Sequence, residues 1–335
     1  MKHPMRIAIN GFGRIGRTIV RQLLTDPAHD DIEVAAINDI AAIDTLAYLL
    51  KYDSVYGPLP VDVAVEDGGL RIGARWVPVT HEPDLAKLRL EGVELLLECT
   101  GKVKSRADAE RYQTTGAGQM LVSGPTEGAD VTCVLGANEE ALGEARIVSN
   151  ASCTTNALAP LLRALDARFG IVQGHMTTVH CYTGSQPMVD APRGDTLARS
   201  RAGGVSMVPT TTSATRLIDR VLPEIRGRVT GAAVRVPSIS VSAIDLTATL
   251  RDAPRDLAAA LTDIAARSAV IGATGDPCVS TDMRGRPESL ILALPEAMAV
   301  GDQVRIFGWY DNEWGFSARM IDMARLMQRR ALPDA

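Results

Sequence analysis

The stretch Met5–Gly16, MRIAINGFGRIG, decides the first half of the fold. A short apolar run is followed by glycines 11, 13 and 16 in GxGxxG spacing, and apolar residues then recur at the spacing of a helix. A second apolar run, residues 32–37, ends at Asn38 and Asp39. Strand, glycine turn, helix, strand and terminal acid together predict a parallel-sheet unit that binds a dinucleotide.

The same stretch indicates which cofactor is bound. Gly11, Gly13 and Gly16 allow the backbone to approach a pyrophosphate at the N-terminus of a helix. Asp39 lies 23 residues after Gly16, where a carboxylate accepts a hydrogen bond from a ribose 2′-OH and repels a 2′-phosphate. We therefore predict NAD in preference to NADP. The alternative is a β-turn followed by a surface aspartate.

Further strands are expected in this half of the chain. Apolar runs at 94–99 and 120–123 predict two more parallel strands, with Thr100 and Ser123 where their carboxyl ends meet a ligand. Between residues 56 and 80 the pattern alternates around an Asp-Gly-Gly turn. This alternation predicts antiparallel hairpins inserted into the unit.

The stretch 146–165, RIVSNASCTTNALAPLLRAL, predicts a strand, a polar turn and a helix. With Ser152 or Asn150 as N-cap, Cys153 falls in the first helical turn, where the helix dipole is expected to lower the thiol pKa. Five of the seven residues 150–156 are Asn, Ser or Thr, which favours an anion-binding turn. The alternative is a buried structural cysteine. Pro160 predicts a kink.

The next segment supplies a candidate base. Residues 171–183 are rich in β-branched side chains and predict a strand that contains His175 and His180. Residues five apart in a strand face opposite sides, so only one of the two imidazoles can face the thiol and activate it. The alternative is a structural histidine.

Two segments could bind anions. Residues 209–213, PTTTS, precede a helical pattern, and hydroxyls at a helix start suit a phosphate, although an ordinary N-cap is the alternative. Arg235 interrupts the apolar alternation of 230–250, and a buried arginine needs an anionic partner such as a substrate phosphate.

The second half differs in class from the first. Residues 230–250 predict one or two strands, 304–309 another strand, and 316–326 a C-terminal helix, while 188–208 predict a long loop that contains Arg199. We therefore predict an α/β protein with a Rossmann-type parallel-sheet NAD-binding domain and an α+β catalytic domain with a mixed or antiparallel sheet. The expected bounds are 1–152, completed by a C-terminal helix at 317–335, and 153–316.

Composition narrows the functional class. The 335 residues carry a net charge of −5 without a basic cluster, so nucleic acid is not an expected partner. No stretch has the roughly 18 uninterrupted apolar residues of a membrane span, so a membrane is not expected either. The five cysteines never occur in CxxC spacing, which argues against a disulfide framework and a metal site. The N-terminal stretch lacks the apolar run of a signal peptide. We expect a cytoplasmic protein.

Four motifs, INGFGRIGR, NASCTTN, TTVHCYT and WYDNEW, give the chain a close resemblance to phosphorylating glyceraldehyde-3-phosphate dehydrogenases over almost its whole length. Erythrose-4-phosphate dehydrogenases share the set. The resemblance implies an NAD-dependent homotetramer of glycolysis that converts glyceraldehyde 3-phosphate and inorganic phosphate to 1,3-bisphosphoglycerate. Cys153 would form a thiohemiacetal and then a thioester, with His180 as its acid–base partner.

The resemblance also implies binding roles. Positions that match substrate or phosphate contacts are Ser152, Thr154, Thr183, Arg199, Thr212, Ser213 and Arg235. Positions that match cofactor contacts, besides the fingerprint glycines Gly13 and Gly16, are Gly11, Arg14, Ile15, Asp39, Thr100, Ser123 and Asn312.

Several positions depart from the family pattern. His81 replaces the usual arginine near the adenine, Ser213 replaces a glycine, and Lys102 and Lys104 add positive charge that leaves room for some NADP use. Ala157 stands where a second cysteine is common. Erythrose 4-phosphate, another aldose phosphate, or arsenate in place of phosphate therefore stay open as alternatives. A non-catalytic binding protein would lack the thiol or the imidazole, and this chain retains both.

Overall fold

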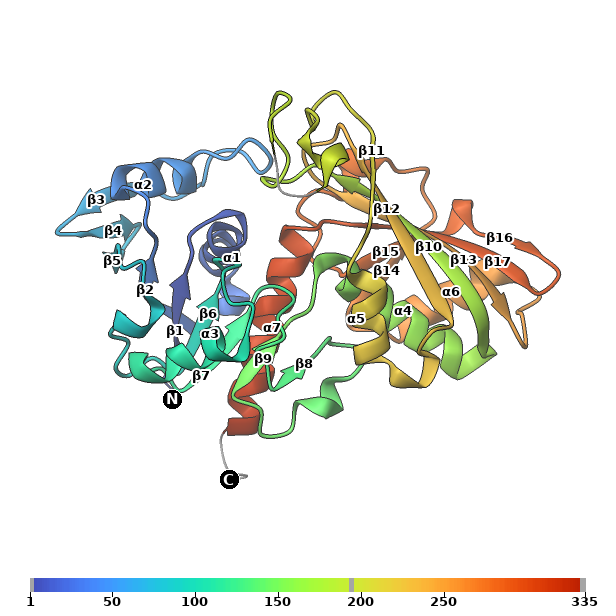
Figure 1. The fold of residues 1–335 in the computed structure, drawn as a ribbon, viewed down its shortest axis with the longest axis horizontal. Coiled ribbons are helices and arrows are strands. Elements are labelled where there is room, and N and C mark those ends of the chain that lie inside the picture. The colour runs from blue at the N-terminus through green and yellow to red at the C-terminus, as the bar shows by residue number, and fades with distance from the viewer. Residues whose placement is uncertain (1–2, 193–195, 332–335) are drawn as a thin grey trace. The chain divides into compact units, whose positions relative to one another are not determined.

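The chain forms two compact units, each built around its own sheet (Figure 1). The computed structural model describes residues 3–192 and 196–331. Unit 1 takes its described residues from 1–133, 140–151 and 317–335, and unit 2 consists of 134–139 and the described part of 152–316. Unit 1 is thus assembled from both ends of the chain.

Unit 1 contains a nine-stranded sheet in the order β3-β4-β5-β2-β1-β6-β7-β9-β8. The strands are β1 (Met5–Asn10), β2 (Ile32–Asn38), β3 (Val63–Glu66), β4 (Gly69–Ile72), β5 (Arg75–Thr80), β6 (Leu95–Glu98), β7 (Gln119–Val122), β8 (Val131–Thr132) and β9 (Ile147–Ser149). Pairs from β5–β2 through β9–β8 are parallel, whereas β3, β4 and β5 form the antiparallel hairpins expected between residues 56 and 80.

The central strands of unit 1 are apolar because both faces of the sheet are covered. Ile9 of β1 lies opposite Ile37 of β2 and Leu97 of β6, and all three are at most 1% exposed. The helices of this unit are α1 (Arg14–Thr25), α2 (Ile43–Lys51), α3 (Arg106–Glu110) and most of α7 (Trp314–Ala331). The buried methionines of α7 at 320, 323 and 327 belong to the unit 1 core.

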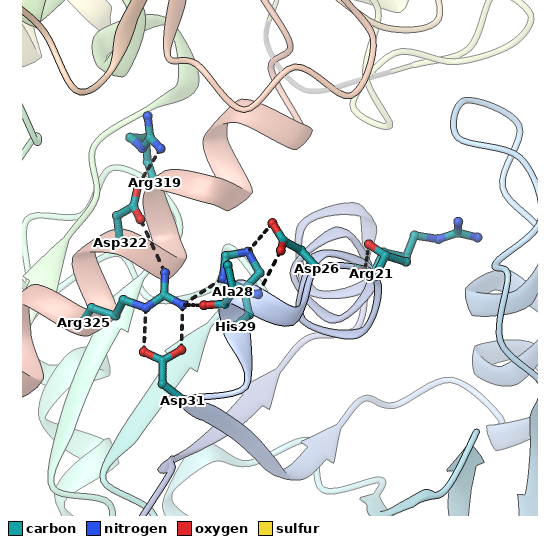
Figure 2. A network of polar contacts seen from close by, with 9 residues as sticks. Arg21, Asp26, Ala28, His29, Asp31, Arg319, Asp322 and Arg325 are labelled. Atoms are coloured by element: carbon teal, nitrogen blue, oxygen red, sulfur yellow. Dashed lines mark hydrogen bonds and ion pairs between the residues drawn. The ribbon is translucent and has the colours of Figure 1, made fainter. Parts of the chain in front are cut away.

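A polar network fastens α7 to the segment before β2 (Figure 2). Arg325 donates from Nε and Nη2 to the two carboxylate oxygens of Asp31, at 2.8 and 2.7 Å, and from Nη2 to the carbonyl of Ala28 at 3.0 Å. His29 Nδ1 lies 2.8 Å from the same Nη2. The two carboxylate contacts make a bidentate pair, which fixes direction as well as distance.

Unit 2 contains a mixed sheet in the order β11-β12-β10-β13-β17-β15-β14, with β16 also paired to β17. The strands are β10 (Ile171–Cys181), β11 (Val208–Thr210), β12 (Val229–Val236), β13 (Ser242–Leu250), β14 (Ile271–Thr274), β15 (Leu290–Ala293), β16 (Met298–Val300) and β17 (Gln303–Tyr310). Only β10–β12 and β14–β15 are parallel pairs. The helices are α4 (Cys153–Phe169), α5 (Ala214–Val221) and α6 (Leu257–Ala266).

The predicted fold class is confirmed, with local differences. Residues 230–250 form two strands, and the helix expected after 209–213 begins at Ala214. The short strand β11, Val208–Thr210, pairs with β12 and was not predicted. Helix α4 continues through Pro160 to Phe169. Parts of two expected segments, 193–195 in the loop and 332–335 in the C-terminal helix, lie outside the described residues. In the part of the chain that is described, no helix combines the length and apolarity needed to span a bilayer.

Candidate active site

A cavity of about 370 Å³ opens at the carboxyl ends of β1, β2 and β6 in unit 1. Gly11, Gly13, Asp39 and Thr100, four of the predicted cofactor contacts, line it. Ligands of open parallel sheets bind at this edge, where the strands end and the connections diverge. The cavity therefore lies where the fingerprint predicts a dinucleotide.

The absence of a side chain has a different consequence at each of the three fingerprint glycines. Gly11 has φ +93°, and a Cβ there would lie 2.7 Å from the backbone of Cys99. A Cβ on Gly16 would lie 2.4 Å from the carbonyl oxygen of Gly11, so helix α1 packs against the turn only without a side chain. Gly13 has open space around its Cβ position and is the N-cap of α1. The open backbone at Gly13 fits a pyrophosphate at a helix N-terminus.

The carboxylate of Asp39 is held by backbone N–H groups. Oδ2 accepts from Phe12 N at 2.7 Å and Oδ1 from Ala41 N at 2.9 Å, and each oxygen keeps a further lone pair for a ribose hydroxyl. His81 Nδ1 lies 2.8 Å from the carbonyl oxygen of Asp39. His81 is exposed, and this contact places it beside Asp39, the acid predicted to bind the ribose.

A polar ladder crosses the same strand ends and was not found from the sequence. Asn38 Nδ2 donates to Asn10 Oδ1 at 2.7 Å, and Asn10 Nδ2 donates to Glu98 Oε2 at 2.6 Å. Glu98 also accepts from Thr100 N at 2.9 Å and from the Thr100 hydroxyl. Burial raises the pKa of Glu98. The available signal was that three neighbouring apolar strands each end in a polar residue.

Three further predicted cofactor contacts of unit 1, Arg14, Ile15 and Ser123, are not among the residues that line the cavity. Arg14 forms an ion pair with Asp53, and its guanidinium stacks 5.6 Å from the ring centroid of Tyr56. Ile15 is half-buried in the first turn of α1. Ser123 follows β7, and its N–H donates to the carbonyl of Glu98 at 2.9 Å.

Cys153 is the first residue of α4 in unit 2, as the capping pattern predicts. Ser152 is the N-cap, and its Oγ accepts from Thr155 N at 3.1 Å. The thiol Sγ lies 3.6 Å from Nε2 of His180 on β10. His175 is exposed on the opposite face of that strand and contacts Thr230, so the alternation of the strand selects which imidazole meets the thiol.

Burial determines the charge state of this pair. It raises the pKa of Cys153, and the positive charge of Arg235 only opposes that rise. Burial and, to a lesser extent, Arg235 lower the pKa of His180 to about 4. The expectation of a lowered thiol pKa at the helix start is therefore wrong for this structure, because loss of solvent outweighs the favourable N–H groups. At neutral pH both groups are uncharged.

Arg235 joins the pair from the neighbouring strand β12. His180 and Arg235 are register partners across β10 and β12. Arg235 Nη1 lies 2.7 Å from His180 Nδ1 and donates to the carbonyl of Cys181 at 3.0 Å. Neither of these partners is an anion, so the positive charge of Arg235 remains available to bind an anion.

Tyr310, the last residue of β17, supports the start of α4 and was not predicted as part of the site. Its hydroxyl lies 2.9 Å from Thr154 Oγ1 and 2.8 Å from Thr178 Oγ1, and its ring meets the ring of His180 edge-on at 6.1 Å. Burial raises the pKa of Tyr310, so its phenol stays protonated. The signal was its position inside the WYDNEW motif.

The other predicted anion contacts form a second group in unit 2. Arg199 donates to Thr210 Oγ1 at 2.8 Å and to the Thr211 carbonyl at 3.3 Å. Thr212 accepts from Ala214 N at 3.1 Å as a local cap, and Ser213 precedes α5 without a side-chain cap bond.

Two predicted contacts stand apart from this group. Thr183 Oγ1 lies 2.9 Å from Ser185 Oγ. Asn312 follows β17 and is buried against Cys181 and Ser242.

Comparison with known proteins gives matches in both units. The model of the glyceraldehyde 3-phosphate dehydrogenase NAD-binding domain matches residues 5–106, and that of the C-terminal domain matches 152–312. The chain is 42% identical to the glyceraldehyde-3-phosphate dehydrogenase of Cereibacter sphaeroides (97% of this chain and 99% of that protein). It is 43% identical to the protein of that name from Xanthobacter flavus (96% and 98%), and 40% identical to glyceraldehyde-3-phosphate dehydrogenase 1 of Bacillus subtilis strain 168 (98% and 99%).

The matched segments contain the features built above. The NAD-binding match includes the fingerprint glycines and Asp39, and the C-terminal match begins at the N-cap Ser152 and includes Cys153, His180 and Asn312. NAD is therefore the cofactor, as predicted, and the chain is an NAD-dependent oxidoreductase. Full-length likeness and two matching domains agree that it belongs to the glyceraldehyde-3-phosphate dehydrogenase family.

Proposed function

We propose that this enzyme oxidises glyceraldehyde 3-phosphate and couples the oxidation to the uptake of inorganic phosphate, giving 1,3-bisphosphoglycerate. The observation that carries the proposal is the 3.6 Å contact between Cys153 Sγ and His180 Nε2 beside the guanidinium of Arg235. A nucleophile, its base and an anion-binding cation are what an acyl transfer to phosphate requires.

His180 starts the reaction by taking the thiol proton. We propose that His180 reacts as the tautomer with its proton on Nδ1, in which Nδ1 and Arg235 Nη1 both donate to the carbonyl of Cys181, at 2.7 and 3.0 Å. The Nε2 lone pair then faces Sγ and accepts the thiol proton as sulfur attacks the aldehyde carbon. His180 then returns this proton to the former carbonyl oxygen, so the product is a neutral thiohemiacetal on Cys153 and the imidazole is again uncharged. Bound NAD supplies the hydride acceptor for its oxidation. His180 accepts the hydroxyl proton in that step, which leaves a thioester.

Inorganic phosphate then attacks the thioester carbon. The acyl phosphate leaves, and the sulfur of Cys153 departs as a thiolate that recovers its proton from His180. We propose that Ser152, Thr154, Thr183, Arg199, Thr212, Ser213 and Arg235 hold the substrate phosphate and the attacking phosphate. The available charge of Arg235 supports this assignment, because it is already beside the reacting pair and its recorded partners are uncharged.

We further propose that the cofactor contacts of NAD are Gly11, Gly13, Arg14, Ile15, Gly16, Asp39, His81, Thr100 and Ser123, and that Asn312 contacts the nicotinamide. In this division, residues 1–152 with 317–335 bind the cofactor and 153–316 carry the chemistry. The 370 Å³ cavity and the contacts of Asp39 support the assignment. Lys102 lines the same cavity, so some NADP use is part of the proposal.

The test is a steady-state assay of NADH formation with glyceraldehyde 3-phosphate and with erythrose 4-phosphate, each with and without phosphate. We expect phosphate-dependent turnover with a higher kcat/KM for the triose. Cys153→Ser should abolish turnover, and His180→Gln should lower it about 10²–10⁴-fold, the usual contribution of a positioned base. Cys278→Ala is the matched thiol control and should keep wild-type rates.

Two outcomes would redirect the proposal. Turnover that stays the same without phosphate would overturn the phosphorylating reaction. A preference for erythrose 4-phosphate would keep the chemistry and change the substrate. Arsenate in place of phosphate should give an acyl arsenate that hydrolyses, so NADH would then accumulate without an acyl phosphate product.

We propose a cytoplasmic homotetramer in which the segment 188–208 contributes to subunit contacts. Its described residues Met188, Val189, Leu197, Val205 and Met207 are each at least 73% exposed, and such a concentration of apolar side chains is typical of an interface. The molar mass in solution tests the assembly, and a monomeric mass would refute it.

A further inference from the structure

The amide of Asn312 has one end fixed and the other free. Oδ1 accepts hydrogen bonds from Cys181 Sγ at 3.2 Å and from Ser242 Oγ at 3.3 Å. Asn312 is 7% exposed, and within residues 3–192 and 196–331 no hydrogen bond from Nδ2 is formed. Residues 181 and 242 belong to the adjacent strands β10 and β13, so the amide oxygen is tied to the sheet itself.

Both partners act as donors toward Oδ1, and an amide oxygen accepts two hydrogen bonds. Burial raises the pKa of Cys181 to about 12, so its thiol keeps its proton at neutral pH. Ser242 Oγ already accepts from Cys181 N at 3.1 Å, which directs its own hydroxyl proton toward Asn312. Rotation of the amide by 180° would turn its NH₂ group onto these two donors. The observed orientation, with Oδ1 toward the two donors and Nδ2 away from them, is therefore the favoured one.

The same residue links Asn312 to the reacting pair. Cys181 follows His180 directly, and its carbonyl lies 2.7 Å from His180 Nδ1. One residue of β10 thus contacts the imidazole through its backbone and the Asn312 amide through its side chain. A substitution at residue 181 therefore changes the contact with the Asn312 side chain and keeps the backbone carbonyl that contacts His180.

We propose that Cys181 and Ser242 are positioning residues that hold Asn312 Oδ1 and so leave Nδ2 as the group offered to the cofactor, and that the enzyme therefore recognises the carbonyl oxygen of the nicotinamide carboxamide and not its NH₂ group. The inference rests on the proposed function, which assigns Asn312 to the nicotinamide. Cys181 and Ser242 touch neither cofactor nor substrate in this account, and they act only through Asn312.

Binding of four nucleotides to the full chain separates this role from a general structural one. The nucleotides are NAD, its 3-acetylpyridine analogue, which keeps the carbonyl oxygen and lacks the NH₂ group, its thionicotinamide analogue, which lacks the carbonyl oxygen, and ADP-ribose, which lacks the ring. For the wild-type enzyme we expect the acetylpyridine analogue to bind within about threefold of NAD and the thio analogue about three- to tenfold more weakly, the range for one hydrogen bond.

Variants then test the two donors. Cys181→Ala and Ser242→Ala should each weaken NAD binding by about threefold, and the double variant by about tenfold, since one and two hydrogen bonds are lost. Their KM for NAD should rise in parallel, with the KM for the sugar phosphate unchanged. Cys181→Ser keeps a donor and should restore NAD binding to within about twofold of wild type. Cys278→Ala is the matched thiol control.

The outcomes distinguish this inference from the proposed function. If the double variant binds NAD as wild type does, or loses affinity for ADP-ribose and NAD equally, the positioning role is refuted while the dehydrogenase activity stands. A thio analogue that binds the wild-type enzyme as tightly as NAD would refute the carbonyl preference. If the wild-type enzyme fails to reduce NAD with any sugar phosphate, the proposed function itself fails.

Discussion

The thiol and imidazole at the centre of unit 2 are both uncharged in the resting protein. Burial raises the pKa of Cys153 and lowers that of His180 to about 4. An ion pair between them would have to form in a site from which water is largely excluded, and isolated charges are costly there. In the proposed reaction, the thiolate would therefore form only as the sulfur attacks the aldehyde carbon.

This charge state makes the stability of unit 2 depend on pH. His180 has an ordinary pKa of about 6.5 when unfolded and about 4 when folded, so the unfolded chain binds the proton more readily. The free energy of unfolding should fall as the pH drops from about 6.5 to 4, by up to about 3 kcal/mol from this group. Urea unfolding followed by the fluorescence of Trp309 and Trp314 measures it.

The matched variant is His180→Gln, which cannot titrate. Because the carboxylates of both proteins titrate alike, the difference between the two pH profiles isolates the imidazole. The two profiles should diverge below pH 6.5, with the variant less sensitive to acid. Parallel profiles over this range would show that His180 has a normal pKa in the folded protein.

Residue-level prediction from sequence succeeded where the signal was local. The spacing of Gly11, Gly13 and Gly16, and the cap Ser152 before Cys153, are read within a few residues of chain. The direction of the Cys153 pKa was missed because burial is a property of everything packed around the sulfur. The Asn10–Glu98 contact, which joins residues 88 apart, and the Cys181–Asn312 contact, which joins residues 131 apart, have no local signature.

Among the elements, α7 is held to unit 1 by a directional contact as well as by its buried methionines. The side chain of Arg325 is 20% exposed and that of Asp31 is 53% exposed, so the pair is only partly screened by solvent. Two parallel hydrogen bonds lower the entropy cost per bond formed. This contact should therefore stabilise the helix more than an ordinary surface ion pair does.

A double-mutant cycle with Arg325→Met and Asp31→Asn should give a coupling energy of about 1 kcal/mol, at the upper end for partly exposed pairs. Unfolding followed through Trp76, the tryptophan of unit 1, is the measurement. The coupling should shrink in about 0.5 M salt, because screening acts on its exposed side.

The pair Arg71–Glu66, on the exposed hairpin of β3 and β4, is the matched comparison and should couple by less than half as much. Equal coupling energies for the two pairs would mean that the bidentate geometry adds nothing to the attachment of α7.

Element prediction from sequence was strongest for long periodic segments and weakest for short ones. The strand beginning at Ile171 and the helix beginning at Cys153 were recognised because alternation or helical spacing runs over ten residues or more. Strands β14 to β16 have three or four residues each and depend on pairing partners that are distant in sequence: β15 and β16 pair with β17, and β14 pairs with β15. Val241, with φ +64°, shows the same dependence, since a β-branched residue adopts this conformation only when its surroundings impose it.

At the scale of the whole molecule, unit 1 depends on chain that follows unit 2 in sequence. Residues 317–335 belong to unit 1. The 165 residues 152–316, which belong to unit 2, separate them from the preceding segment of unit 1, residues 140–151. Removing residues 317–335 should therefore abolish NAD binding, since Met320, Met323 and Met327 leave the core together and large-to-small losses of this kind cost about 2–5 kcal/mol each.

Titration with NAD and the near-ultraviolet signal of Trp76 measure the effect of this truncation. The full-length variant Arg325→Met, which loses the polar contact and keeps the helix, should still bind NAD within about threefold of wild type, a loss on the order of 0.7 kcal/mol. A truncated chain with wild-type affinity for NAD would show that α7 is dispensable to unit 1.

The late position of α7 also bears on the order in which the protein is synthesised. All nine strands of the unit 1 sheet leave the ribosome before α7 does, and most of unit 2, residues 152–316, is translated after the last of them. During that interval the nascent sheet lacks its covering helix, and exposed apolar surface of this kind is what chaperones recognise and what aggregates. Nascent chains stalled before α7 should therefore be retained by chaperones, and those extended beyond it should be released.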